Sequence, residues 1–190
     1  MAGGVCSSGS HCLVSACRWF FFRVSNVENQ ALTLSIMNAG KASYPEGWKD
    51  YKACCSYDRK TWRRVATTYD EAAGQLVITH TPQQNSAYFA YFAPYTLDMH
   101  MHLIAQTQLA PQTKLVMLGE TLDGHDLDML VLGTESPEKK KIWVIGRQHP
   151  GETMAEWFVE GLLDRLTDRC PAPLRTSSPR ALSCCILSAL

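Results

Sequence analysis

Ile142-Trp-Val-Ile-Gly-Arg-Gln-His-Pro-Gly-Glu-Thr153 is the stretch of sequence that decides the fold. A short apolar run suited to a buried strand ends at Gly146, and Pro150-Gly151 makes a tight turn. From Thr153 onward, apolar residues recur with helical spacing as far as Leu166. A strand that passes directly into a helix in this way predicts the start of an α/β layer.

His149 and Glu152 stand three residues apart in this strand-to-helix corner, a spacing at which an imidazole and a carboxylate can share one metal ion. Zinc accepts such nitrogen and oxygen ligands, and a catalytic site leaves one position open for water. An ordinary turn followed by a carboxylate at a helix N-terminus has the same spacing. His125 and Asp128 repeat this spacing beside a predicted hairpin, where we interpret it as accidental.

Residues before this corner read as short strands separated by Asp, Gly, Pro and Asn, which is typical of an antiparallel sandwich. The candidate strands cover 19–25, 31–37, 51–56, 62–66, 75–81 and 87–92. Residues 97–108 fit either a strand or a helix. A paired hairpin at 114–118 and 127–132, with Asp123-Gly124 as its turn, then leads to a strand at 141–146.

The predicted fold class is therefore mixed α/β: an N-terminal antiparallel β-sandwich followed by the start of an α/β domain. We place the sandwich domain at 18–108 and the beginning of the α/β domain at 109–168. Residues 1–17 and 169–190 are predicted to be atypical, poorly ordered ends, because they are rich in Ser, Cys or Pro and lack a clear period. Residues 184–190 are compatible with a short strand or a helix.

Three segments together resemble one family. Arg-Gln-His-Pro-Gly-Glu-Thr at 147–153 is similar to the zinc-binding segment of the metallocarboxypeptidases, and specifically of the cytosolic carboxypeptidases. Ala-Tyr-Phe-Ala-Pro-Tyr-Thr at 90–96 resembles the domain junction of that branch. Gly-Glu-Thr-Leu-Asp-Gly-His-Asp-Leu-Asp-Met-Leu at 119–130 resembles its hairpin. The resemblance implies a carboxypeptidase-like α/β domain and a zinc-dependent enzyme that hydrolyses the C-terminal residues of peptides or proteins.

By this resemblance His149 and Glu152 are the first two Zn²⁺ ligands, and Arg147 lines the substrate site. The family takes its third ligand, a histidine, from a later strand, and places its substrate-binding arginine and general-base glutamate further on. No histidine follows His149, so these three residues are not assigned. His100 and His102 would share a face on a strand but diverge on a helix, and the resemblance favours a helix with solvated histidines.

Composition narrows the functional classes. The chain of 190 residues has 18 basic and 18 acidic residues, so its net charge of zero argues against nucleic-acid binding. No apolar run is long enough for a membrane helix, and residues 1–12 lack the basic and apolar parts of a signal peptide. We therefore expect a cytoplasmic protein with reduced cysteines, and the oligomeric state stays open.

Six of the eight cysteines lie before residue 18 or after residue 169. The expectation is that both ends depart from the family's reading frame or that the gene is a fragment; a natural Ser/Pro-rich tail is the alternative. An incomplete α/β domain would expose apolar surface, so we predict that it is marginally stable, prone to aggregation or completed by a partner chain. Peptidase activity of the chain alone should then be weak.

Two other functions stay open. The sandwich could be a non-catalytic module that binds a protein partner through aromatic side chains, for which Tyr88, Tyr91 and Tyr95 are candidates, although these tyrosines also fit a buried core. The chain could also be a degenerate fragment without a function.

Overall fold

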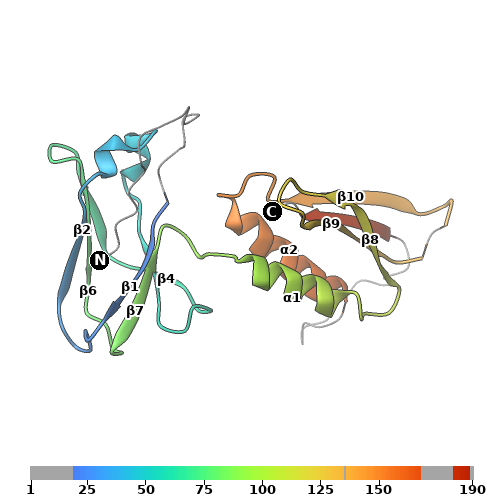
Figure 1. Ribbon diagram of the computed structural model, residues 1–190, viewed down its shortest axis with the longest axis horizontal. Coiled ribbons are helices and arrows are strands. Elements are labelled where there is room, and N and C mark those ends of the chain that lie inside the picture. The colour runs from blue at the N-terminus through green and yellow to red at the C-terminus, as the bar shows by residue number, and fades with distance from the viewer. Residues whose placement is uncertain (1–18, 135, 168–181, 189–190) are drawn as a thin grey trace. The chain divides into compact units, whose positions relative to one another are not determined.

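The computed structural model describes residues 19–134 and 136–167 in full and the backbone of 182–188. The chain divides into two compact units, Met1–Ala93 and Pro94–Leu190 (Figure 1). None of the helices in these described ranges has the length and apolar character needed to cross a membrane.

The first unit is an antiparallel β-sandwich, as the short alternating strands predict. One sheet has the order β1 (Phe21–Ser25), β7 (Ser86–Ala90), β3 (Cys54–Ser56) and β4 (Arg63–Arg64). The other has the order β2 (Leu32–Ile36), β6 (Gln75–His80) and β5 (Thr67–Asp70). Two short 3₁₀ helices, η1 (Ala39–Lys41) and η2 (Pro45–Trp48), follow β2. Strand β5 and both 3₁₀ helices have no counterpart among the elements predicted from the sequence.

The core of the sandwich forms between the two sheets because inward-facing apolar residues alternate with outward-facing polar ones. Ile78 of β6 and Phe89 of β7 are completely buried in it, and the rings of Phe22 and Phe89 stack with their centroids 5.6 Å apart. Tyr88 and Tyr91 are half-buried and Tyr95 is buried, so none of the three candidate binding aromatics is fully exposed.

Cys54 and Cys55 are both free and buried in the first unit. Burial raises the pKa of both thiols, for Cys55 to about 11, so they stay protonated and unreactive near neutral pH. This agrees with the expectation of reduced thiols for these two residues. The six other cysteines lie outside the residues whose side chains are described.

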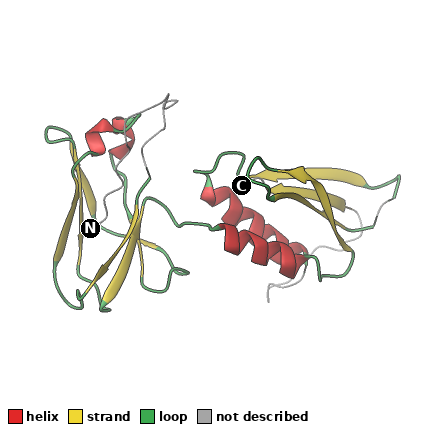
Figure 2. Ribbon diagram, viewed as in Figure 1, coloured by secondary structure: helices red, strands yellow, loops and turns green. Residues whose placement is uncertain are grey.

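The second unit packs two helices on one face of a four-stranded sheet (Figure 2). Its elements are α1 (Leu97–Thr107), β8 (Thr113–Glu120), β9 (Asp126–Leu132), β10 (Lys140–Gly146), α2 (Thr153–Leu166) and β11 (Leu182–Ser188). The sheet order is β10, β11, β9, β8; β10 and β11 are parallel and the other two pairs antiparallel. The mixed fold class predicted from the sequence is therefore confirmed.

Helix α1 belongs to the second unit because its buried side chains pack into that unit's core. Leu103 and Ile104 cluster with Leu130 of β9 and with Val159 and Leu163 of α2. The unit thus begins at Pro94, ahead of the helix, whereas the boundary drawn from the sequence lies after it, between 108 and 109. The amphipathic pattern of this histidine-rich segment does not indicate which unit's core its buried residues join. The predicted boundary differs from the observed one for this reason.

The chain beyond the second helix contributes to the sheet. The sequence leaves 184–190, in the end predicted to be atypical, open between a short strand and a helix. Residues 182–188 form β11, which lies between β10 and β9. Of the two alternatives, the structure has the strand, and β11 pairs in parallel with β10. Residues 1–18 and 168–181 lie outside the described part of the chain.

Strand β10 is less buried than its apolar sequence predicts. Val144 packs against the core, but the side chains of Trp143 and Ile145 are 59% and 50% exposed. On helix α2 the apolar side chains of Met154 and Phe158 are exposed as well. The side chains that α2 buries are Thr153, Glu156, Val159 and Leu163.

Candidate metal centre

The strand-to-helix corner is built where β10 ends against α2. Gly146 closes β10, and its α-carbon lies so near Val159 of α2 that a side chain at 146 would not fit. The chain then turns through residues 147–151 and enters α2 at Thr153. The amide of Glu152 donates to the carbonyl of His149 at 3.0 Å, and this bond closes the turn.

His149 and Glu152 lie side by side at this corner. Nδ1 of His149 is 3.0 Å from Oε1 of Glu152, and the two side chains are 77% and 49% exposed. Glu152 is the N-cap residue of α2, yet its carboxylate makes no capping hydrogen bond to the helix. A carboxylate in this position commonly accepts from the first-turn amides, so its turn toward the imidazole is specific to this corner.

The pair fits zinc as two of its ligands. In a tetrahedral site with bonds of about 2.0–2.2 Å, two ligand atoms lie about 3.4 Å apart, so the observed 3.0 Å separation needs only a small opening to admit the ion. Imidazole nitrogen and carboxylate oxygen are both zinc donors, and their exposure leaves room for further ligands. Within the ranges that the structure describes, no three His, Cys, Asp or Glu side chains are grouped to hold a metal ion.

Arg147 stands beside the pair in an uncommon backbone conformation. Its φ of 50° lies in the left-handed region, which residues other than glycine seldom adopt. Nη1 donates to the carbonyl of Tyr95 at 2.9 Å, while Nε and Nη2 donate to the carbonyl of Pro150 at 3.3 and 3.1 Å. Desolvation lowers the pKa of Arg147, and the carboxylate of Glu156 opposes that shift. That Arg147 lines a substrate site stays a prediction. The hydrogen-bond partners observed for its guanidinium are carbonyl oxygens of the protein itself.

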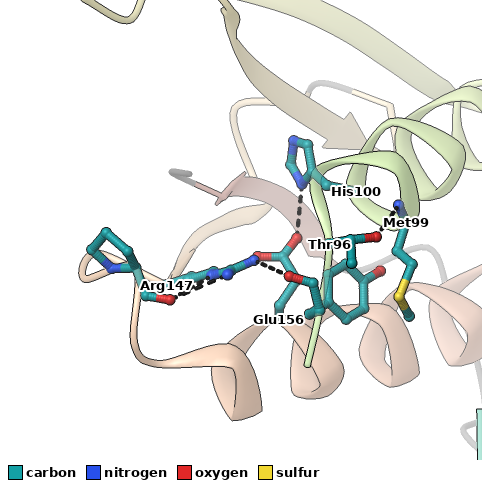
Figure 3. A network of polar contacts seen from close by, with 7 residues as sticks. Thr96, Met99, His100, Arg147 and Glu156 are labelled. Carbon is teal, nitrogen blue, oxygen red and sulfur yellow. Dashed lines mark hydrogen bonds and ion pairs between the residues drawn. The ribbon is translucent and has the colours of Figure 1, made fainter. Parts of the chain in front are cut away.

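A second histidine–carboxylate pair lies behind the corner (Figure 3). Nδ1 of His100 is 2.8 Å from Oε1 of Glu156, and these side chains are only 6% and 0% exposed. The helix favoured for 97–108 is confirmed as α1, and it separates His100 from the exposed His102. The expectation that both histidines are solvated is wrong for His100, because α1 turns it toward α2.

The sequence patterns did not identify Glu156 and His100 as partners. A signal for Glu156 exists, since it lies three residues before Val159 and seven before Leu163, on the buried stripe of α2. A glutamate in such a stripe needs a buried partner. The sequence separation between α1 and α2 conceals which residue supplies it.

Two family models match the chain. Residues 12–92 match the cytosolic carboxypeptidase N-terminal domain, and residues 99–172 match the zinc carboxypeptidase domain. The fold is similar to that of a putative carboxypeptidase from Burkholderia mallei, with a TM-score of 0.79 and 41% identity over 90% of this chain and 44% of that one. It is also similar to a Pseudomonas aeruginosa metallo-carboxypeptidase solved in complex with (2-guanidinoethylmercapto)succinic acid, with a TM-score of 0.77, 30% identity and coverage of 90% and 45%.

Sequence relatives agree with the structural ones. An uncharacterized protein of Zymomonas mobilis, ZMO1242, is 48% identical over 151 residues, which are 80% of this chain and 38% of that protein. Human cytosolic carboxypeptidase 2 is 28% identical over 182 residues, covering 81% of this chain and 20% of the human protein. The chain spans less than half the length of each of these relatives. With the family's two consecutive domains matched, the chain belongs to the zinc carboxypeptidases of the cytosolic carboxypeptidase branch.

Proposed function

We propose that this chain supplies His149 and Glu152 as two ligands of a catalytic zinc ion in a carboxypeptidase. The observation that carries the proposal is the 3.0 Å approach of His149 Nδ1 to Glu152 Oε1 at the end of β10. The zinc carboxypeptidase model that matches this part of the chain supports it. When bound, zinc lowers the pKa of a coordinated water toward about 7 and polarises the carbonyl of the scissile bond.

The role proposed for the corner residues is to bind the zinc ion and to orient the side chains that ligate it. His149 presents a ring nitrogen, and Glu152 presents an oxygen that no capping bond occupies. The turn bond between the Glu152 amide and the His149 carbonyl fixes their spacing. The described residues supply no third ligand, so we expect weak peptide hydrolysis from this chain alone.

The proposed substrate is the C-terminal residue of a peptide or protein, and the proposed location is the cytoplasm. Both proposals draw their support from the family: the relatives are carboxypeptidases, and several are named cytosolic. Contact between Arg147 and the substrate is part of the proposal made from sequence, and the partners observed for its guanidinium do not require it.

A zinc titration of the full chain by calorimetry tests this proposal. We expect binding with a stoichiometry near one in the wild type and its loss in His149→Ala. His125→Ala is the matched control, because this exposed histidine lies outside the corner. Release of C-terminal amino acids from a synthetic peptide, measured in parallel, should fall in His149→Ala and Glu152→Gln. Zinc binding that is unchanged in His149→Ala would show that the proposal is wrong.

A further inference from the structure

Arg147 is the residue at which the corner is both strained and restrained. A φ of 50° is strained for a residue with a side chain, and such conformations persist only where surrounding contacts hold them. The contacts here are the three hydrogen bonds from the guanidinium to Tyr95 and Pro150. Strain that is held in place beside a candidate metal site points to a role for Arg147 in that site.

The carbonyl of Pro150 is the acceptor that links the guanidinium of Arg147 to the candidate metal site. Pro150 lies between His149 and Glu152, and two nitrogens of the planar guanidinium, Nε and Nη2, donate to its oxygen. The third nitrogen, Nη1, ties the same side chain to the carbonyl of Tyr95, which is itself buried. The peptide between the two ligands is therefore fastened to the core of the second unit.

Glu156 of α2 interacts with both His100 and Arg147. Its carboxylate is fully buried, accepts a contact from His100 at 2.8 Å, and attracts the positive charge of Arg147 (Figure 3). A partly desolvated guanidinium is stable only with such compensation. The charge of Glu156 thus adds to the hydrogen bonds that hold the guanidinium of Arg147.

We propose that Arg147 is a positioning residue that preorganises His149 and Glu152 for the metal ion. This inference rests on the proposed function, because it assumes that these two residues bind zinc. Each of the three guanidinium nitrogens already donates to a protein carbonyl, which favours this role over direct recognition of the substrate. Outer partners that orient metal ligands commonly account for a 10–100-fold difference in metal affinity.

Replacement by asparagine tests the inference most directly. Asparagine tolerates a positive φ, so Arg147→Asn should keep the turn while its short side chain cannot reach both carbonyls. We expect the dissociation constant for Zn²⁺, measured by calorimetry on the full chain, to rise about 10–100-fold. Arg147→Lys keeps the charge but lacks the planar fork, and should restore only part of the affinity. Arg23→Gln, at an exposed position on β1, is the matched control and should bind as the wild type does.

The comparison with His149→Ala separates the two proposals. Loss of zinc binding in His149→Ala together with wild-type binding in Arg147→Asn overturns the positioning role and leaves the metal site intact. Wild-type binding in both variants overturns both. Urea denaturation of the metal-free proteins, run alongside, should show that Arg147→Asn is fully folded under the conditions of the titration, so that its weaker zinc binding reports the corner and not global unfolding.

A measurement on the wild type covers the case in which the variants fail to fold. If Arg147 preorganises the corner, the Glu152 amide that donates to His149 is already protected from hydrogen exchange without metal. Added Zn²⁺ should then change its exchange rate less than tenfold. Unprotected exchange at Glu152 in the metal-free protein, followed by protection on adding zinc, would mean that the metal orders the turn and would overturn the inference.

Discussion

Gly146 and Val159 approach so closely that a β-carbon on residue 146 would lie 2.7 Å from Cγ2 of Val159. Val159 is 1% exposed and sits in the core cluster of the second unit, so it has little space in which to yield. The absence of a side chain at 146 is what lets the end of β10 rest on α2. The distance between strand and helix, and with it the position of the corner, depends on this glycine.

Gly146→Ala should therefore destabilise the second unit by about 1–3 kcal/mol through overpacking. Urea denaturation followed by tryptophan fluorescence measures this. Gly161→Ala in α2 is the matched control: nothing lies within 4 Å of its added β-carbon, and alanine should stabilise the helix by up to about 1 kcal/mol. Equal stabilities of the two variants would contradict the close packing of β10 on α2.

The buried pair of His100 and Glu156 should show strong coupling. Glu156→Leu removes the acceptor 2.8 Å from His100 Nδ1, and breaking a buried pair in this way costs about 3–5 kcal/mol. The double variant His100→Leu/Glu156→Leu should lose less than the sum of the single variants, with a coupling of about 0.5–3 kcal/mol.

His102→Leu serves as the control for that cycle, because His102 is exposed on the same helix and should change stability by no more than about 0.5 kcal/mol. Strictly additive losses in the cycle would show that the two side chains do not interact in solution.

Asp58 should make the first unit sensitive to acid. The amides of Thr61 and Lys60 donate to Oδ1 at 2.7 and 2.8 Å, and these bonds, helped by the Ser56 hydroxyl, hold the pKa of Asp58 well below its ordinary value of 3.8. A lowered folded pKa means that the carboxylate stabilises the fold above pH 3.8, and that this contribution fades as the pH falls below 3.8.

The measurement is the stability of Asp58→Ala against that of the wild type from pH 7 down to pH 2. The difference should be full at neutral pH and shrink below about pH 4. Glu28→Ala, an exposed change in the same unit, should track the wild type throughout. A difference that grows as the pH falls would have the wrong sign and refute the assignment.

Trp143 and Ile145 should make the protein self-associate. They lie on one face of β10, the strand at one edge of the described sheet, and are 59% and 50% exposed. An apolar edge strand is an aggregation site, and lysine is the residue that blocks one. Trp143→Lys/Ile145→Lys should lower light scattering on heating and the binding of a hydrophobic dye, with little loss of stability. Val144→Lys should destabilise the fold instead, since Val144 packs on the core.

The sequence identifies the elements that depend on local pattern. Alternation in 31–37 and 75–81 predicts β2 and β6 within one residue at either end, and the apolar period after the corner predicts α2 at Thr153–Leu166. Both metal-ligand candidates also follow from a local spacing, because the tight turn at Pro150-Gly151 brings His149 and Glu152 together without help from distant residues.

Features that depend on distant contacts could not be predicted. Strand β5 carries Thr67 and Thr68, whose pairing with β6 outweighs their weak pattern. The buried face of α2 includes the ionisable residue Glu156. His100, from another helix, offsets the free-energy cost of burying that carboxylate. The hydrogen bond from Arg147 to the carbonyl of Tyr95 joins residues 52 positions apart, and no local sequence spacing predicts it.

The place of β11 in the sheet has a consequence for biosynthesis. β11 lies between β9 and β10 although it is the last of the three to leave the ribosome, so this sheet cannot close until Ser188 has emerged. The sandwich, complete by Ala93, is free to fold while translation continues. During that interval the nascent chain carries a finished module followed by a β8–β9 hairpin and a strand β10 that still lack the strand that joins them.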